Sequence, residues 1–184
     1  MAIKKTSKEE ILQESIKLFK QKGYYNCSMA NIADACGLIK GSIYHYFKSK
    51  DEIGIESLKY IHNYFVDNIF SIAYDTNLKD EEKIKLIVKK TDEYFLNSKG
   101  GCLLGNLALE VSSENIEFKE VIKEYFTAWE NALFNIFKNK YEESKSRILA
   151  REYVALIQGS IMMMNLYDDS SNYLQVGEKL ISLI

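Results

Sequence analysis

Helical periodicity runs through almost the whole chain, and it is the feature that most restricts the fold. Apolar residues recur three or four positions apart in segment after segment, and no segment sustains the alternation of a strand. The 184 residues include no proline, which breaks helix interiors and marks loops and strand edges. The sequence therefore predicts an all-α protein with about nine helices.

Four helices are predicted in the first part of the chain, and serines mark where they begin. Ser7 with Glu10, and Ser49 with Glu52, have the spacing of capping boxes, in which two side chains satisfy backbone amides reciprocally. Ser28 is the expected N-cap of a short second helix, which a glycine turn joins to a short third helix. That pair has the pattern of a helix-turn-helix. The four helices are expected at about 7–23, 28–36, 40–47 and 49–74.

The remaining sequence predicts five more helices separated by short polar breaks such as Ser112–Glu114. They are expected at about 79–98, 102–112, 115–139, 144–167 and 171–184. Because helix four begins in the N-terminal region and continues into the rest, both regions share it. We expect two domains, residues 1–48 and 49–184.

Charge is distributed unevenly along the chain. Residues 1–50 hold nine lysines against four acidic residues, a net charge of +5, and residues 51–184 carry −7. A basic end on an acidic body suggests contact with a polyanion at that end alone. Chance variation in a lysine-rich composition is the alternative.

Cysteine usage and the N-terminal sequence point to the cytoplasm. Cys27, Cys36 and Cys102 are odd in number and lack the spacing of a zinc or redox motif, so free thiols in a reducing compartment are expected. The first residues do not form a signal peptide, and no apolar run approaches the ~20 residues that span a membrane. We expect a cytoplasmic protein with no membrane partner, metal or cofactor.

The segment LIKGSIYHYFKSKDEIG, residues 38–54, concentrates lysines and aromatic rings. On a helix turning about 100° per residue, Ile43 and Phe47 point together into a small core. The opposite surface offers positive charge, ring donors and a glycine that permits close approach, with no Asp or Glu between residues 35 and 50. Such a surface suits a phosphate backbone. Lys50 and Ser28 lie at helix starts, where amide groups also favour anions.

The longer stretch NIADACGLIKGSIYHYFKSKDEI resembles the signature of the TetR/AcrR family of transcriptional regulators. The resemblance is strong over residues 7–58, and GCLLGNLALEV is similar to the start of the sixth helix in one branch of that family. It implies an all-α homodimer, in which each subunit joins a three-helix DNA-binding head to a body that binds a small-molecule effector and mediates dimerisation. The matching residues are Ile32, Ala33, Gly37, Lys40, Gly41, Ser42, Tyr44, His45, Tyr46, Phe47 and Lys50.

The resemblance also implies which residues meet double-stranded DNA. Lys40, Gly41 and Tyr44 fall on the helix that enters the major groove, whereas Tyr44, His45 and Lys50 fall on phosphate contacts. Ile39 departs from the Ser or Ala that is common in the family, and it either contacts a thymine methyl or leans on the core of the head. The full expected set is Ser28, Ile39, Lys40, Gly41, Ser42, Tyr44, His45, Lys48 and Lys50.

Aromatic residues along 118–137 indicate either a plain core helix or the lining of an effector cavity, which the resemblance favours. Cys102 lies at a helix start, where the dipole favours the thiolate, and it matches a cysteine of family members thought to sense electrophiles. The alternative is that Cys102 is an unreactive, small apolar residue of the core. Asn106 shares its helix face and is expected to be buried, with its amide either bonded to the backbone or left for a ligand. The candidates are Phe65, Tyr94, Phe95, Cys102, Asn106, Tyr125, Phe126 and Trp129.

The segment SRILAREYVALIQGSIMMMNLY is apolar nearly all round, so it must be covered on two sides. We predict that residues 144–184 form a two-fold dimer interface. The alternative is that the apolar helix is buried within a monomer. The candidate interface residues are Leu156, Gly159, Ser160, Met163, Leu174 and Leu180.

Together these features predict a transcriptional repressor whose homodimer binds a palindromic operator and is released by a small-molecule effector. The alternatives are an electrophile response through Cys102, an activator on the same fold, or a helical interaction module without DNA binding. An enzyme is disfavoured, because the two histidines, His45 and His62, accompany no nucleophile motif, phosphate loop or metal spacing.

Overall fold

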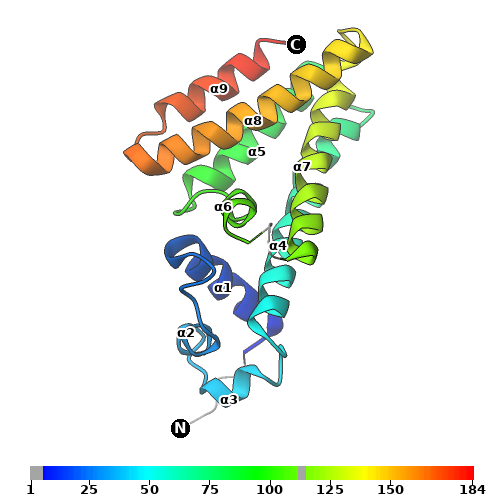
Figure 1. Cartoon of the computed structure of the whole chain (residues 1–184). Coiled ribbons are helices and arrows are strands. Elements are labelled where there is room, and N and C mark those ends of the chain that lie inside the picture. The colour runs from blue at the N-terminus through cyan, green and yellow to red at the C-terminus, as the bar shows by residue number, and fades with distance from the viewer. Residues whose placement is uncertain (1–5, 112–114) are drawn as a thin grey trace. The chain divides into compact units, whose positions relative to one another are not determined.

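Nine α-helices and one 3₁₀ helix make up the regular structure of residues 6–111 and 115–184, which the computed structural model describes (Figure 1). These residues contain no strand, so the predicted all-α class is confirmed. The break predicted at Ser112–Glu114 lies outside the described residues. The helices are α1 (Lys8–Lys22), α2 (Met29–Ala35), α3 (Lys40–Ile43), α4 (Lys50–Asn68), η1 (Phe70–Tyr74), α5 (Asp80–Leu96), α6 (Leu103–Glu110), α7 (Ile116–Phe137), α8 (Glu143–Tyr167) and α9 (Ser171–Ile181).

The described chain divides into two compact units. The head unit comprises residues 6–61, 103–111 and 115–122, and the body unit comprises residues 62–102 and 123–184. Helices α4 and α7 each contribute residues to both units. The head unit therefore includes α6, although α6 is far along the chain from α1–α3. The domain boundary expected after residue 48 stays a prediction.

The two predicted capping boxes form to different extents. The Glu10 backbone amide donates to the Ser7 hydroxyl at 3.1 Å, and the Ser7 amide donates to the Glu10 carboxylate at 3.2 Å, which confirms the first box. In the second, the Glu52 amide donates to the Ser49 hydroxyl at 3.1 Å. The Glu52 carboxylate, however, accepts from the Lys48 amide at 2.6 Å. In the second box the Glu52 carboxylate therefore accepts from the amide of Lys48, where a complete capping box has the amide of Ser49.

Helix α3 is shorter than the predicted 40–47 segment. It ends at Ile43, and the chain continues as a turn in which the amides of Tyr46 and Phe47 donate to the Ile43 carbonyl at 3.0 and 3.1 Å. Ile43 and Phe47 are both buried, as their spacing predicted. The turn thus preserves the inward face while leaving the intervening side chains outside.

Helix α4 ends at Asn68, and the expected continuation to residue 74 is wrong, because η1 follows it as a separate 3₁₀ helix. Asn68 donates through its side-chain amide to the Tyr64 carbonyl at 2.9 Å, and Ser71 donates to the Asp67 carbonyl at 2.8 Å. Such bonds compete with the regular backbone ladder and favour a helix end.

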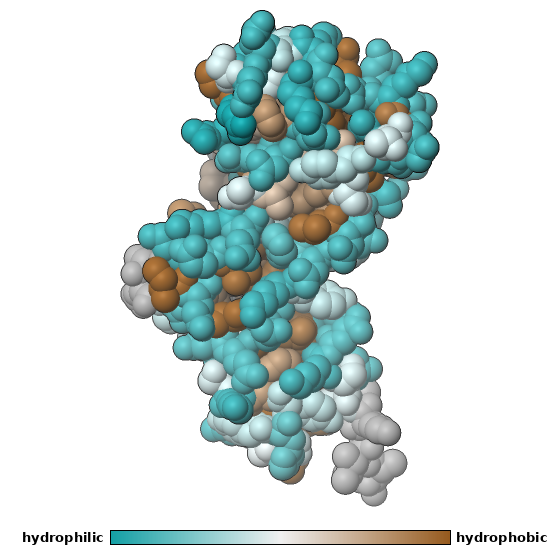
Figure 2. Space-filling model, turned by 90° about the vertical axis from the view of Figure 1, so that its right-hand side faces the viewer, coloured by the Kyte–Doolittle hydropathy of each residue, from teal (hydrophilic) through white to brown (hydrophobic). Residues whose placement is uncertain are grey.

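In the body unit, α9 lies beside α8 and also contacts α5 (Figure 1). A Cβ atom added at Gly177 would lie 3.0 Å from Val88 Cγ1, so the glycine lets α9 approach α5 closely. Most of the face shown in Figure 2 is hydrophilic, and apolar residues appear there as separate small patches. None of the helices in the described ranges is long and apolar enough to cross a membrane.

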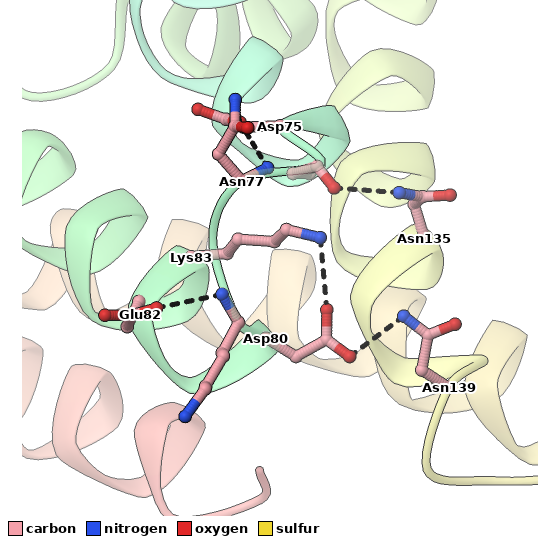
Figure 3. Close-up of polar contacts among 9 residues, drawn as sticks. Asp75, Asn77, Asp80, Glu82, Lys83, Asn135 and Asn139 are labelled. Carbon is pink, nitrogen blue, oxygen red and sulfur yellow. Dashed lines mark hydrogen bonds and ion pairs between the residues drawn. The ribbon is translucent and has the colours of Figure 1, made fainter.

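A polar network ties the start of α5 to α7 (Figure 3). Asp80 accepts from Lys83 Nζ at 3.3 Å and from the Asn139 side-chain amide at 2.9 Å, and Asn135 donates to the Ala73 carbonyl at 2.8 Å. Lys83 is only 8% exposed, and its ion pair offsets the cost of burying the charge. The network holds the first turn of α5 in place.

Candidate DNA-binding surface and effector cavity

The residues predicted to contact DNA lie on an exposed surface over α3 and the turn that follows it. Lys40, Gly41, Tyr44, His45 and Lys48 are all exposed. A Cβ atom at Gly41 would meet no atom within 4 Å, so a flat partner can approach the backbone there. The structure thus brings together two cations, two hydrogen-bonding rings and a bare backbone site.

Ile39 and Ser28 flank this surface in different ways. Ile39 is the N-cap residue of α3 without a capping bond, and it is 77% exposed, so it does not lean on the core. Its methyl groups are free to meet a thymine methyl. Ser28 is the predicted N-cap of α2: its hydroxyl accepts from the Asn31 amide at 3.2 Å and donates to Asn31 Oδ1 at 2.8 Å. Ser42, the remaining candidate, is half-buried.

Lys50 makes contacts inside the head unit. Its Nζ donates to the Tyr24 carbonyl at 3.0 Å and lies 4.1 Å from the centroid of the Tyr24 ring. The Tyr24 hydroxyl in turn donates to Asp51, and burial together with this bond raises the pKa of Tyr24. Lys50 therefore braces α4 against the loop between α1 and α2. The phosphate contact assigned to Lys50 stays a prediction.

Glu110 is a structural residue of the head unit that was not predicted from the sequence. Its carboxylate accepts from two successive backbone amides of the α1–α2 loop, Tyr24 at 2.9 Å and Tyr25 at 2.8 Å. Glu110 is the single charged residue of α6, at the end of an otherwise apolar helix. In the sequence, this lone carboxylate at the end of an apolar helix is the feature that could have indicated a structural role for Glu110. This bond ties α6 to the loop that precedes the helix-turn-helix.

Phe118 packs into the same joint through an aromatic contact. Its ring meets Tyr24 edge-on, with 5.1 Å between the centroids, and a Cβ atom at Gly54 would lie 2.6 Å from Phe118 Cζ. The glycine in the middle of α4 is therefore required by the close approach of Phe118. The α1–α2 loop, α4, α6 and the first turns of α7 meet around Tyr24.

Replacing Glu110 with Gln should lower the free energy of unfolding by about 2 kcal/mol, because charge-assisted bonds to two amides are lost and the new NH₂ group faces a donor. Urea denaturation followed by circular dichroism measures the change. The matched control is Glu124→Gln, an exposed carboxylate on α7. Equal stability of the two variants would contradict a structural role for the Glu110 bonds.

The aromatic candidates for an effector site come together in the body unit. Phe65 lies at the centre, with its ring centroid 4.7 Å from Tyr94, 5.8 Å from Phe95, 5.3 Å from Tyr125 and 6.2 Å from Trp129. Phe126 contacts the edge of this cluster through Tyr125. Phe70 of η1 joins the cluster as well, with its ring centroid 5.6 Å from that of Phe65. It was not among the predicted residues, because the sequence predicts a continuous helix through this position.

A small cavity of about 20 Å³ lies next to this cluster. Asp92 is a polar residue in the wall of this cavity, and its carboxylate accepts a hydrogen bond from the Tyr173 hydroxyl. Burial raises the pKa of the Asp92 carboxyl, and burial beside that carboxylate raises the pKa of Tyr173. The cavity is lined by Ile87, Val88, Thr91, Asp92, Trp129, Ile157, Tyr173, Gly177 and Leu180.

Cys102 and Asn106 belong to different units, the body unit and the head unit respectively. Cys102 directly precedes α6, as predicted, and is 5% exposed, with the Tyr125 hydroxyl beside its thiol. Asn106 belongs to the head unit and is exposed, so its predicted burial is wrong. Leu109, which was predicted to share a face of α6 with Asn106, is also exposed. The buried face of this short helix is formed by Leu103, Leu104 and Leu107.

The candidate interface residues fall into two groups. Leu156 and Leu174 are exposed, and Gly159 and Met163 are half-buried. Leu156, Gly159 and Met163, together with Met162, border a groove along α8 and α9. The other two are buried within the subunit: Ser160 donates to the Ile157 carbonyl at 2.8 Å, and Leu180 lines the cavity.

No group of three or more His, Cys, Asp or Glu side chains in the described ranges is placed to hold a metal ion.

Two family models match the chain. The model for "Bacterial regulatory proteins, tetR family" matches residues 7–56, and the model for "Transcriptional regulator LmrA/YxaF-like, C-terminal domain" matches residues 81–179. The first match contains the exposed α3 surface. The second contains the aromatic cluster residues of α5 and α7, all of the cavity lining except Leu180, and most of α8 and α9.

Three similar proteins cover between 71% and 100% of this chain. The HTH-type transcriptional regulator YxaF of Bacillus subtilis is 29% identical over 97% of this chain and 95% of its own. The negative regulator IcaR of the biofilm operon icaADBC in Staphylococcus epidermidis is 25% identical over 71% of this chain and 69% of its own. A TetR transcriptional regulator from Legionella pneumophila has the same fold, with a TM-score of 0.88, 24% identity and full coverage of both chains.

Proposed function

Because the chain belongs to the TetR family and is a DNA-binding transcriptional regulator, we propose that it is a ligand-released repressor that binds a palindromic operator as a homodimer. The observation that carries this proposal is the exposed surface over α3. There Lys40 and Lys48 supply charge, Tyr44 and His45 supply donors, and Gly41 leaves the backbone open. The name of the staphylococcal relative, a negative regulator, favours repression over activation.

Contacts to DNA would divide between the groove and the backbone. Lys40, Gly41 and Tyr44, at the start and end of α3, would reach base edges, with Ile39 against a thymine methyl. His45 and Lys48, on the following turn, would contact phosphates. Such a regulator acts where the chromosome lies, so we expect it in the cytoplasm.

Selection of bound duplexes from a random DNA pool tests the proposal. The purified protein is incubated with the pool at 50 and 200 mM salt, and bound DNA is sequenced. We expect an inverted repeat whose half-sites lie one helical turn apart or a small multiple of it, with affinity that falls steeply with salt. No enriched sequence at either salt concentration would contradict the proposal.

The groove on α8 and α9 supports the proposed dimer. Large apolar side chains, among them Leu156, Met162, Leu166 and Tyr167, are exposed along α8. A groove and an apolar ridge on the same two helices can meet their own copies across a two-fold axis. Gly159 leaves open space in which the partner helix can approach, since a Cβ atom there would meet nothing within 4 Å.

Replacing Leu156 with Lys should weaken the dimer at least 10-fold, because the two-fold axis would bring charge into an apolar interface from both subunits. Sedimentation velocity across a dilution series measures the dissociation constant. Leu109→Lys, the same change at a more exposed leucine of the head unit, serves as the control. A Leu156→Lys protein that stays dimeric would place the interface elsewhere.

Effector binding in the body unit would release DNA by a population shift. The cavity and the aromatic cluster belong to the body unit, and α4 runs from Lys50 in the head unit to Asn68 in the body unit. An effector that binds better to a conformation with displaced heads shifts the equilibrium by its differential affinity. Helix α4 is the element through which both units would respond.

An electrophile response through Cys102 is the second candidate. The position of the thiol directly before α6 and beside the Tyr125 hydroxyl favours it, whereas its burial restricts access of reagents. If Cys102 is the sensor, Cys102→Ser should abolish release of DNA by an alkylating reagent such as N-ethylmaleimide. Release that persists in this variant would exclude the sensor role.

A further inference from the structure

The segment MAIKKTSK, residues 1–8, carries three lysines and no acidic residue. Its last three residues, Thr6, Ser7 and Lys8, belong to the part of the chain that the structure describes. Lys8 is exposed and is the first residue of α1. A positive side chain at that position slightly opposes the helix macrodipole, so the stability of α1 does not account for it. The reason for this basic segment must therefore lie outside α1.

Thr6 fixes where the segment meets the rest of the head unit. The Tyr46 hydroxyl donates to the Thr6 carbonyl at 3.1 Å, a bond between residues that are 40 positions apart. The Thr6 hydroxyl donates to the Glu10 carboxylate at 2.7 Å, and Thr6 is buried. Because it is bonded through both its carbonyl and its side chain, Thr6 is a fixed point from which the preceding residues extend.

Tyr46 lies in the turn that follows α3, among the residues predicted to contact DNA. Tyr44 precedes it and Lys48 follows it, and both of these are exposed, whereas Tyr46 is half-buried. Lys8 approaches the same turn, since its Nζ lies 5.2 Å from the centroid of the Phe47 ring. Two contacts thus hold the base of the N-terminal segment beside the exposed surface over α3.

The length of the chain limits how far Lys4 and Lys5 can be from this point. Both lie outside the described residues, but one residue spans at most about 3.6 Å, so their backbones attach within about 7 and 4 Å of Thr6. The acidic residues that follow, Glu9 and Glu10, each accept a hydrogen bond from a side chain of the head unit. The lysines therefore form a local concentration of positive charge next to the surface over α3.

From these observations we propose that Lys4, Lys5 and Lys8 form a basic arm that contacts DNA phosphates beside the surface over α3, and that Tyr46 positions this arm. Lysine acts as a point charge, which suits phosphate oxygens and carries no sequence information. The arm adds contacts to the set that was predicted from the sequence. This inference rests on the proposed function only in that it concerns the same DNA-binding head; it requires neither an effector nor repression.

Replacing Lys4, Lys5 and Lys8 together with Gln removes the charges and keeps the side-chain length. A homodimer carries each lysine twice, and each phosphate contact contributes about 0.9 to the slope of log affinity against log salt. We therefore expect this slope to fall by about 3 to 5. Affinity at 50 mM salt should fall at least about 10-fold, equally for the selected operator and for an unrelated duplex of the same length. Fluorescence anisotropy between 50 and 200 mM salt measures both quantities.

Three exposed lysines of the body unit provide the matched control. Replacing Lys85, Lys89 and Lys138 with Gln changes the net charge by the same amount, far along the chain from the arm. This control should leave the salt slope unchanged to within about one. Thermal unfolding is recorded on the same samples, and we expect the arm variant to unfold within a few degrees of the original protein.

Tyr46→Phe tests the positioning role, because it removes the hydroxyl that holds the Thr6 carbonyl and keeps the ring. In the original chain this change should weaken binding to both duplexes by about 3-fold or more, the effect of one net hydrogen bond. In the chain that already lacks the three lysines, the same change should have no effect, because no basic arm is left to position. A purely structural role of Tyr46 would give equal losses in the two backgrounds.

Each measurement can contradict one part of the proposal. An arm variant with the salt slope of the control would exclude the phosphate contacts. A loss that is larger for the operator than for the unrelated duplex would mean that the arm reads bases. A Tyr46→Phe loss that persists without the lysines would remove its positioning role. Absence of any enriched operator would contradict the proposed repressor, whereas the salt slope on the unrelated duplex would still decide whether the arm binds DNA.

Discussion

Replacing Lys40 and Tyr44 together with alanine is expected to lower affinity for the selected operator by about 100-fold or more, since each contact to a base or phosphate contributes about 1–3 kcal/mol. Both side chains are exposed, and neither makes a hydrogen bond or ion pair within the part of the chain that the structure describes. Their removal costs the head unit no internal contact of that kind. The loss should therefore appear in DNA binding and leave the unfolding temperature within a few degrees.

Fluorescence anisotropy with a labelled operator measures this loss, and thermal unfolding is recorded on the same samples. The matched control is Tyr74→Ala combined with Lys85→Ala, an exposed tyrosine and an exposed lysine of the body unit. A salt series adds a second readout, because loss of one phosphate contact lowers the slope of log affinity against log salt by about one. A double variant that binds the operator like the control would remove α3 from the interface.

Replacing Gly54 with Val is expected to lower the free energy of unfolding by about 3 kcal/mol or more, at the upper end of overpacking effects. A Cβ atom at this position would lie 2.6 and 2.9 Å from Phe118 Cζ and Cε1 and 3.0 Å from Tyr24 Cε2. Phe118 and Tyr24 are themselves buried, so neither ring can turn away without opening a gap. The gain in helix propensity from replacing glycine by valine is only a few tenths of a kcal/mol and cannot compensate.

Urea denaturation of each variant measures the effect, and a second glycine provides the contrast. Gly159→Ala lies in the interior of α8 with open space around it, so this change should not destabilise the subunit. In a Gly54→Ala background, Phe118→Leu should recover part of the lost stability, because it removes the atoms that the new methyl group meets. A Gly54→Val protein as stable as the original would mean that the joint around Tyr24 is loosely packed.

Local chemistry explains why much of the head unit could be predicted. The Ser7 and Ser28 caps, the glycine turn and the inward face of Ile43 and Phe47 depend on residues within four positions of one another, and such signals are visible in a single sequence. The exposure of Lys40 and Tyr44 follows from the same helical periodicity. The end of α4 was harder to predict, since Asn68 and Ser71 act through side-chain bonds that compete with an otherwise continuous apolar pattern.

The sequence alone determined the all-α class, the order of the helices and the exposed lysines and rings over α3 that we propose face DNA, because periodicity, capping and charge are properties of short segments. Only the tertiary structure decided that Glu110 binds the α1–α2 loop, that Lys50 is engaged by Tyr24, that Asn106 is exposed and that Leu180 lines a cavity. These features depend on contacts between residues far apart in the chain, and the spacing of residues along a single helix carries no information about which partner a buried group will meet.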